Sequence, residues 1–169
     1  MLRGLAHALR NAGRKDFHLV RTAHEWASVF SIPGPHDETV RVLDVGGAYQ
    51  SATYVDDRRF EPVFEYYRTF DAVFRCGIPL RRVLMIGGGG CAWPKHAVAT
   101  HPGLSVDVAE EDRGVIDIAR RFFFVDELEG RGLRLIAAEG RTFLERTART
   151  YDAILNDAFR GADPARSLA

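Results

Sequence analysis

Residues 82–92 read Arg82-Val83-Leu84-Met85-Ile86-Gly87-Gly88-Gly89-Gly90-Cys91-Ala92, a continuous apolar run that ends in four glycines. Such a run is typical of a strand buried on both faces of a parallel sheet. The glycines satisfy the pattern G-x-G-x-x-A directly after a strand, and they let a backbone approach a ligand closely. This stretch therefore predicts an α/β fold with a nucleoside-binding loop that contains Gly87, Gly88 and Gly89.

Three further strands alternate with helices after this loop. The apolar periodicity predicts helices over 94–100, 113–123 (capped by Asp112) and 141–148, and strands over 104–109, 133–137 and 151–156. The order β-α-β-α-β-α-β indicates a parallel sheet with right-handed crossovers. No fifth strand follows, so we expect an incomplete sheet whose apolar fourth strand needs another chain or the N-terminal segment to cover it.

The first 76 residues have a different pattern. Alternating apolar residues around Gly46-Gly47 predict a β-hairpin over 39–56, and an apolar face predicts a helix over 61–76. Residues 1–36 end in a breaker and are interpreted as a mainly helical lead. The expected organisation is a lead over 1–36, a hairpin plus helix over 37–76, and a nucleoside-binding α/β domain over 77–169, truncated after its fourth strand.

Composition excludes several classes of protein. The 169 residues suit about one domain. Because 23 basic residues balance 23 acidic ones, no overall charge favours nucleic acid or an anionic membrane. The chain has no run of about 18 apolar residues, so no membrane span is expected. Cys76 and Cys91 form no CxxC, which favours reduced thiols in a cytoplasmic protein, and the scattered histidines predict no metal site.

Acidic residues follow the other predicted strands. Glu110 ends the second strand, 21 residues after Gly89, at the spacing of an acid that binds ribose hydroxyls. Glu139-Gly140 follows the third strand and Asp157 the fourth. Since the carboxyl ends of parallel strands meet at one edge, we expect these residues to line one site.

The start of the next helix bears on the ligand. Trp93-Pro94 delays that helix beyond the glycines. A dinucleotide site instead begins its helix inside the motif and directs it at a pyrophosphate. The wider loop favours an adenosyl sulfonium such as S-adenosylmethionine over NAD.

Several segments together resemble the spermidine synthase family. They are Ala48–Ser51, Val83–Gly89, Val106–Asp112, Glu139–Leu144 and Tyr151–Phe159. The resemblance implies a Rossmann-like methyltransferase-type fold. It also implies transfer of an aminopropyl group from decarboxylated S-adenosylmethionine to a diamine, with release of methylthioadenosine. A homodimer is usual in that family, so a homo-oligomer is expected, with a nucleoside donor and an amine as its small-molecule partners.

The resemblance also implies roles for single residues. The donor would be held by the glycine loop, by Glu110 at the ribose, by Glu139 and Gly140 at the adenine, and by Gln50 from the hairpin. Asp157 would accept the proton of the attacking amine. Glu65 would bind the polyamine, and the rings of Tyr49, Tyr66 and Tyr67 could attract its charge.

Two departures from the family pattern, together with Lys95, leave alternatives open. Gly90 stands where the family has an acid, and Arg160 places a positive charge where a polyamine would lie. Lys95, in the first turn of the next helix, could meet the carboxylate of intact S-adenosylmethionine. These residues favour an S-adenosylmethionine-dependent methyltransferase as the second hypothesis. A non-catalytic nucleoside-binding or assembly module is the third.

Overall fold

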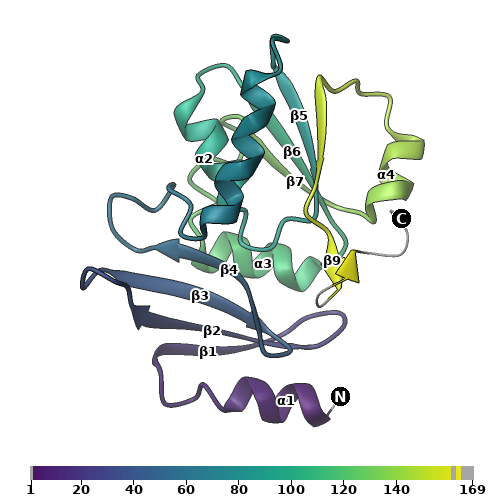
Figure 1. The fold of residues 1–169 in the computed structure, drawn as a ribbon. Coiled ribbons are helices and arrows are strands. Elements are labelled where there is room, and N and C mark those ends of the chain that lie inside the picture. Colours follow the sequence, from purple (N-terminus) through teal and green to yellow (C-terminus); the bar gives the residue numbers. More distant parts are fainter. Residues whose placement is uncertain (1, 161–162, 165–169) are drawn as a thin grey trace.

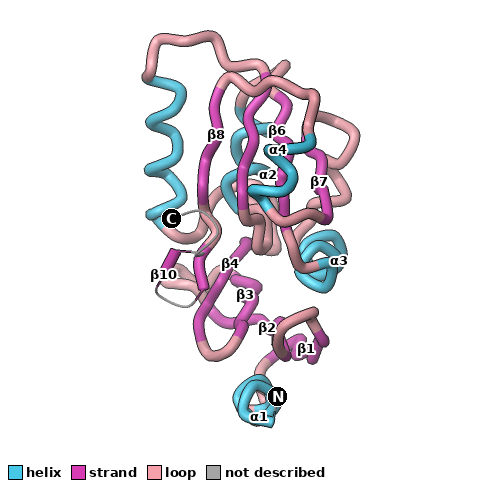
Figure 2. The backbone as a smooth tube through the Cα atoms, turned by 90° about the vertical axis from the view of Figure 1, so that its right-hand side faces the viewer, coloured by secondary structure: helices cyan, strands magenta, loops and turns pink. Residues whose placement is uncertain are grey.

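The computed structural model describes residues 2–160 and 163–164, with side chains from residue 4 to residue 158. Two four-stranded β-sheets lie one above the other, and α3 (Arg113–Phe122) lies between them (Figure 1). Figure 2 shows α1 (Leu2–Leu9) at the far end of the first sheet. The first sheet is antiparallel, in the order β1-β2-β3-β4. Its strands are β1 (Lys15–Arg21), β2 (Trp26–Pro33), β3 (Thr39–Val45) and β4 (Ala48–Tyr54).

The prediction of a helical lead over residues 1–36 is wrong beyond Leu9. Residues 15–33 form β1 and β2, which pair antiparallel, and β2 pairs in turn with β3. The physical reason is the composition of β2, whose aromatic and β-branched residues suit a buried strand. The expected boundary at residue 36 therefore falls in the turn between two paired strands.

The predicted hairpin is confirmed. Gly46 and Gly47 have φ of +62° and +96° between β3 and β4, a conformation that favours glycine. The helix predicted over 61–76 forms only from Glu65 to Arg75, as the 3₁₀ helix η1. It starts late because Pro62 makes an isolated bridge with Thr53, which keeps the chain extended beside β4.

The second sheet is parallel, in the order β7-β6-β5-β8, which confirms the predicted α/β fold. The predicted alternation of strands and helices is also confirmed, although element ends shift by a few residues. The helix after the glycine loop begins at Ala92 rather than Pro94, because proline fits the first turn of a helix. The elements are β5 (Arg82–Ile86), α2 (Ala92–Thr100), β6 (Ser105–Glu110), β7 (Leu133–Ala137), α4 (Gly140–Arg146) and β8 (Ala153–Asn156).

The two faces of the parallel sheet bury different layers. Val83, Met85, Val106 and Val108 belong to the larger core, with side chains of η1, α2 and α3. Alternate residues of the same strands, among them Leu84, pack with Phe143 and Leu144 of α4. This period of two is what a strand buried on both faces requires.

The strand order places a ligand crevice beside β5. β5 pairs with β6 on one side and with β8 on the other, so the direction of winding reverses between β5 and β8. Open α/β sheets bind ligands outside the carboxyl ends of the strands at such a reversal. Gly87 follows β5 and Asp157 follows β8, so both lie at this point.

β8 is an edge strand in the part of the chain that the structure describes. Two-residue strands, β9 (Phe159–Arg160) and β10 (Asp163–Pro164), pair with each other rather than with β8. Ile154 of β8 is 51% exposed, whereas its neighbours Ala153 and Leu155 are partly buried. Within residues 2–160 and 163–164, no helix is long and apolar enough to cross a bilayer.

Candidate functional site

Hydrogen bonds hold the backbone of the glycine loop against the carboxyl end of β6. The amide of Gly87 donates to the carbonyl of Ala109 at 2.9 Å, and the amide of Gly88 donates to Oε2 of Glu110 at 2.9 Å. A turn follows, in which the amide of Cys91 donates to the carbonyl of Gly88 at 2.7 Å. The loop backbone is therefore fixed against the end of β6.

Close approaches on two sides explain the glycines. A Cβ on Gly87 would lie 2.8 Å from the carbonyl oxygen of Asp157, and one on Gly90 would lie 2.6 Å from the ring of Phe123. Both distances are shorter than side chains tolerate. A Cβ on Gly89 would instead make ordinary contact, 3.5 Å from the carbonyl oxygen of Gln50. The structure thus brings the predicted residues Gln50, Gly87, Gly89 and Asp157 together.

Glu110 lies at the carboxyl end of β6, where the sequence predicts it. Besides the amide of Gly88, its carboxylate accepts the amide of Asp112 at 3.0 Å. Burial raises the pKa of Glu110, and the backbone hydrogen bonds from Asp112 and Gly88 oppose the shift. A carboxylate has about four acceptor sites, so two amide bonds leave acceptor capacity for the hydroxyls of a sugar.

Asp157 follows β8 and is held by its backbone. Its amide donates to the carbonyl of Ile86 at 2.8 Å. Burial raises the pKa of the Asp157 carboxyl to about 7, with no counteracting partner among the side chains that the structure describes, those of residues 4–158. A half-buried acid with a pKa near neutrality can take up and release a proton at physiological pH, which is what a general base needs.

Two tyrosines of η1, whose rings the resemblance places near the polyamine, face this edge. Tyr67 is buried, and its hydroxyl donates to the carbonyl of Gln50 at 3.3 Å. The ring of Tyr66 lies 4.1 Å from that of Tyr67. Burial raises the pKa of Tyr66 to about 12, and the charge of Asp157 adds to the shift. The sequence analysis names Tyr67 for its ring, whereas the structure shows its hydroxyl on the carbonyl of Gln50.

Glu139 and Gly140 lie at the amino end of α4 and stabilise it there. The Glu139 carboxylate caps this helix, accepting the amide of Arg141 at 3.0 Å and the amide of Thr142 at 2.8 Å. Gly140 is buried, and a Cβ there would overlap the side chain of Ile86. Both residues lie where the sequence predicts, at the carboxyl edge after β7, and both have a structural task in this state.

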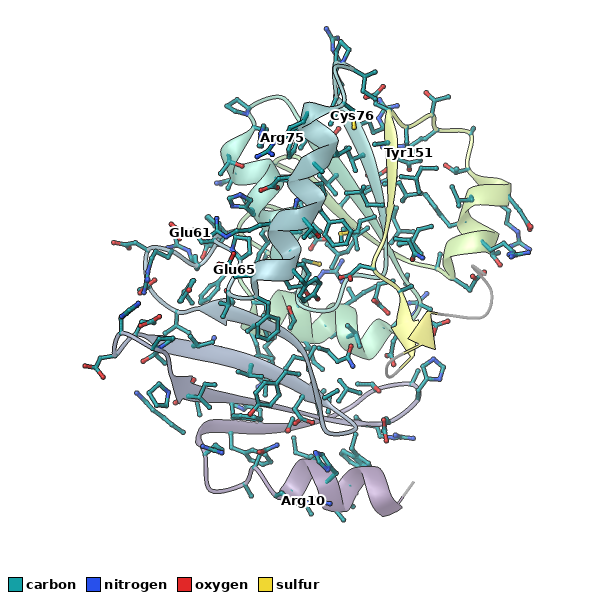
Figure 3. The ribbon with its side chains drawn as sticks, viewed as in Figure 1. Arg10, Glu61, Glu65, Arg75, Cys76 and Tyr151 are labelled. Atoms are coloured by element: carbon teal, nitrogen blue, oxygen red, sulfur yellow. The ribbon has the colours of Figure 1, made fainter. Side chains whose placement is uncertain are left out.

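The structure gives Glu65 and Tyr49 other surroundings than the predicted site. Glu65 begins η1 (Figure 3), is 86% exposed in its side chain, and pairs with Arg68 at 3.5 Å. Tyr49 is half exposed and packs edge-on against Phe30. Neither side chain makes a described contact with the glycine loop.

The expectation that Lys95 could meet a ligand carboxylate is wrong. Lys95 is only 1% exposed, and its ammonium donates three hydrogen bonds to protein oxygens. A side chain with all three of its hydrogens used has no donor left for a ligand. Lys95 therefore no longer favours methyl transfer over aminopropyl transfer.

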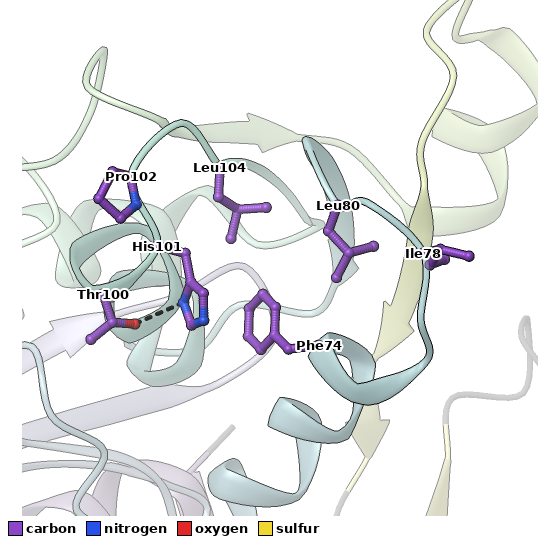
Figure 4. Close-up of a pocket in the computed structure, with 7 residues that line it drawn as sticks. All are labelled: Phe74, Ile78, Leu80, Thr100, His101, Pro102 and Leu104. Carbon is purple, nitrogen blue, oxygen red and sulfur yellow. Dashed lines mark hydrogen bonds between the residues drawn. The ribbon is translucent and has the colours of Figure 1, made fainter.

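A shallow pocket at the other end of the sheet is separate from this site. Leu80, directly before β5, and Leu104, directly before β6, line it (Figure 4). Its floor includes the ring of His101, which stacks on Phe74 at 3.8 Å. Because it lies at the amino ends of the strands, it shares no residue with the glycine loop. Among the described residues, no group of three His, Cys, Asp or Glu is arranged to hold a metal ion.

Comparison with known proteins identifies the sequence family. The family model described as "Spermine/spermidine synthase domain" matches residues 64–168. The polyamine aminopropyltransferase of Agathobacter rectalis is 34% identical over 80 residues, which cover 46% of this chain and 28% of the relative. Spermidine synthase 2 of Arabidopsis thaliana is 27% identical over 132 residues, covering 71% of this chain and 39% of the relative. The chain thus spans less than two fifths of these relatives' length in either match.

Solved structures support the fold. A probable spermidine synthase from Corynebacterium glutamicum superposes with a TM-score of 0.69 at 19% identity, covering 86% of this chain and 53% of that one. The spermidine synthase from Thermotoga maritima superposes with a TM-score of 0.55 at 21% identity, over 83% of this chain and 48% of the other. At these identities the two likenesses support the fold alone.

Proposed function

The chain belongs to the spermine/spermidine synthase family, and on that premise we propose that it takes part in aminopropyl transfer from decarboxylated S-adenosylmethionine to a diamine. The observation that carries the proposal is Asp157, a half-buried acid with a pKa raised to about 7 beside the glycine loop. An acid in this state at the carboxyl edge of β5 and β8 suits proton transfer at neutral pH.

The donor would lie between the glycine loop and β4. Gly87, Gly88 and Gly89 would offer their backbone to the nucleoside, and Glu110 would accept the ribose hydroxyls. Gln50 would cover the nucleoside from β4, because its carbonyl lies only 3.5 Å from a Cβ built on Gly89. The adenine would lie near Glu139 and Gly140 at the end of β7.

The reaction joins the amine to the carbon beside the sulfonium. The lone pair of a neutral amine nitrogen forms the new C–N bond while the C–S bond breaks. The electron pair of the broken bond goes to sulfur, which leaves as the neutral thioether methylthioadenosine. The extra proton on nitrogen passes to the carboxylate of Asp157 and then to water. Since a free alkylamine is mostly protonated at pH 7, an acceptor with a pKa near 7 is well matched to this task.

The first experiment is a pair of calorimetric titrations of the purified chain, with decarboxylated S-adenosylmethionine and with S-adenosylmethionine. We expect tighter binding of the decarboxylated donor, and methylthioadenosine release when putrescine is added. Heat from neither donor would refute a complete nucleoside site in this chain and would favour the third hypothesis, a non-catalytic module.

Methyl transfer from S-adenosylmethionine remains the second candidate because of Gly90. A Cβ at this position would lie 2.6 Å from the ring of Phe123 and 2.7 Å from the hydroxyl of Ser51, so no acid fits there without rearrangement. An acid at this position is what the resemblance implies for the donor amine. Formation of S-adenosylhomocysteine in place of methylthioadenosine would decide for this candidate.

A further inference from the structure

Lys95 is a buried cation that meets no carboxylate within hydrogen-bond distance. Its Nζ donates to Oγ1 of Thr53 at 3.1 Å, to the carbonyl of Arg59 at 3.1 Å and to the carbonyl of Phe123 at 2.6 Å. All three ammonium hydrogens are used, and all three acceptors are neutral. Burial lowers the pKa of Lys95 to about 8, so its charge is held here at a cost. A buried ammonium that is costly to hold is expected to have a role in the structure or the function of the protein.

The three acceptors come from three separate segments around α2. Thr53 lies in β4, Arg59 in the loop after β4, and Phe123 directly after α3. Lys95 itself is in the first turn of α2, where its amide donates to the carbonyl of Cys91 at 3.0 Å. We call these four residues the Lys95 clasp. The clasp joins the first sheet to the helix that leaves the glycine loop.

The residues that the clasp holds form the wall of the loop. β4 carries Gln50 and Ser51, which approach Gly89 and Gly90 from the first sheet. The ring of Phe123 is fully buried and lies against Gly90. A shift of β4 or of Phe123 would therefore change the space that a nucleoside needs.

We propose that Lys95 is a positioning residue, which holds β4 and Phe123 against the glycine loop and so sets the affinity for the nucleoside. The part of this statement that concerns the nucleoside rests on the proposed function. The part that concerns β4 does not, because the hydrogen bonds exist without a ligand.

A neighbouring hydrogen bond supplies a matched control. Nη1 of Arg41 in β3 donates to the carbonyl of Phe122 at 3.0 Å, so it also joins the first sheet to the end of α3. Phe122 packs with Ala27 and Val29 of β2 in a cluster that also includes Phe123. The Arg41 hydrogen bond ends on the Phe122 carbonyl, and not on Gln50, Ser51 or the Phe123 ring that line the loop, so Arg41→Gln should lose stability with little effect on the wall of the glycine loop.

The test compares Thr53→Val, Lys95→Met and Arg41→Gln with the unchanged chain. The probe is methylthioadenosine, titrated by calorimetry, together with hydrogen exchange of the amides over 49–53 and 88–92. We expect Thr53→Val to weaken binding about tenfold and Lys95→Met to weaken it more, as lost hydrogen bonds to a charged group imply. Both should speed exchange in the two segments, whereas Arg41→Gln should bind within twofold and leave that exchange unchanged.

Two results would overturn the proposal. One is unchanged exchange and affinity in a folded Thr53→Val variant, which retains the shape of the residue without its hydroxyl. The other is an equal loss of affinity in Arg41→Gln, which would show a general effect of stability. If the unchanged chain binds no methylthioadenosine, the proposed function fails, while the exchange measurement still decides whether Lys95 holds β4.

Discussion

Two aspartates of the parallel sheet have opposite surroundings. Asp107 in β6 is buried, 2% exposed, and accepts hydrogen bonds from Arg134, Arg149 and Tyr151. Burial alone would raise the pKa of Asp107, but the hydrogen bonds and charges of these partners hold it below its usual range. Asp157 has no such partner among the described side chains, and burial raises its pKa to about 7.

The difference between the two acids follows their places in the sheet. The partners of Asp107 offset the effect of burial on its pKa, whereas at Asp157 burial acts alone among the described side chains. Asp107 lies in the middle of β6, and its partners come from β7 and from the loop before β8, where Tyr151 lies (Figure 3). Asp157 lies at the carboxyl edge, beside the winding reversal. The partners of Asp107 favour its charged form, whereas an acid whose pKa is raised by burial is available for proton transfer.

The largest effect should come from replacing Asp157, and it should be on the rate of aminopropyl transfer. The Asp157→Asn variant retains the shape of the side chain but cannot accept a proton. We expect the rate of aminopropyl transfer to fall about 10³-fold, as is typical when a general base is removed. Methylthioadenosine affinity should stay within about twofold, because Asp157 contacts the loop through its backbone.

The control for this variant lies at the other end of β8. Asp152 precedes the strand and accepts the amides of Arg81 and Arg82 at 2.7 and 2.8 Å. An Asp152→Asn variant removes an acid from the same strand without touching the carboxyl edge, so its transfer rate should be unchanged. Turnover in Asp157→Asn within threefold of the unchanged chain would show that another group is the base.

Replacing Asp107 should instead lower the stability of the fold. In Asp107→Asn the guanidinium of Arg134 loses the carboxylate that it pairs with. The side-chain amide of the new asparagine would also face the N–H and O–H groups that donate to Asp107, so donor would meet donor. We expect the free energy of unfolding to fall by about 3 kcal/mol, at the low end for a broken buried pair because Arg134 is 43% exposed. Urea denaturation measures this change, and a loss under about 0.5 kcal/mol would show that the network adds nothing net.

The sequence predicted the parallel half of the fold well because its signals are local. The apolar run before Gly87 and the acids after the other three strands are short stretches of sequence, and their placement follows from strand burial and from the meeting of carboxyl ends. Residues 15–33 were mistaken for part of a helical lead because their burial depends on pairing with β3, which lies later in the chain. Single-segment patterns carry no information about such pairing.

The grouping of the candidate site residues was predictable only in part. Gln50, Gly87, Gly89 and Asp157 come together as expected, since each is tied to a strand end or to a hairpin. The burial of Lys95 is not predictable, because its three acceptors lie up to 42 residues from it along the chain. Two of these acceptors are backbone carbonyls, which every residue type has, so no pattern of side chains marks them.

The next largest effect concerns Glu110, which combines features of both aspartates. It is buried with a raised pKa, yet it is held by two backbone amides. In Glu110→Gln the side-chain amide would face one of these donors, so the loop should loosen. We expect methylthioadenosine affinity to fall about tenfold, the cost of one hydrogen bond to a charged group. Calorimetry measures it, with Glu111→Gln on the next residue as the control, and equal affinities in the two variants would contradict the assignment.

The smallest effect, and the sharpest contrast between the two aspartates, is in the pH dependence. A base with a pKa of about 7 is mostly protonated at pH 6 and mostly ionised at pH 8, so kcat/KM should rise about tenfold between them. Stability should change in the opposite direction. The folded-state pKa of Asp157 lies above its unfolded value, so its contribution is fully present below about pH 4 and is lost as the pH rises through about 7.

Asp107 reverses this sign, because its folded-state pKa is lowered. Its contribution is present above the unfolded pKa of about 4 and is lost as the pH falls below it. Urea denaturation of Asp157→Asn and Asp107→Asn between pH 3 and 8 separates the two. Asp157→Asn should gain stability relative to the unchanged chain as the pH rises from about 4 to 7. For Asp107→Asn, the loss of stability relative to the unchanged chain should be smallest near pH 3. If Asp157→Asn shows a constant difference across that range, Asp157 has an ordinary pKa, and burial at the carboxyl edge does not prepare it as a base.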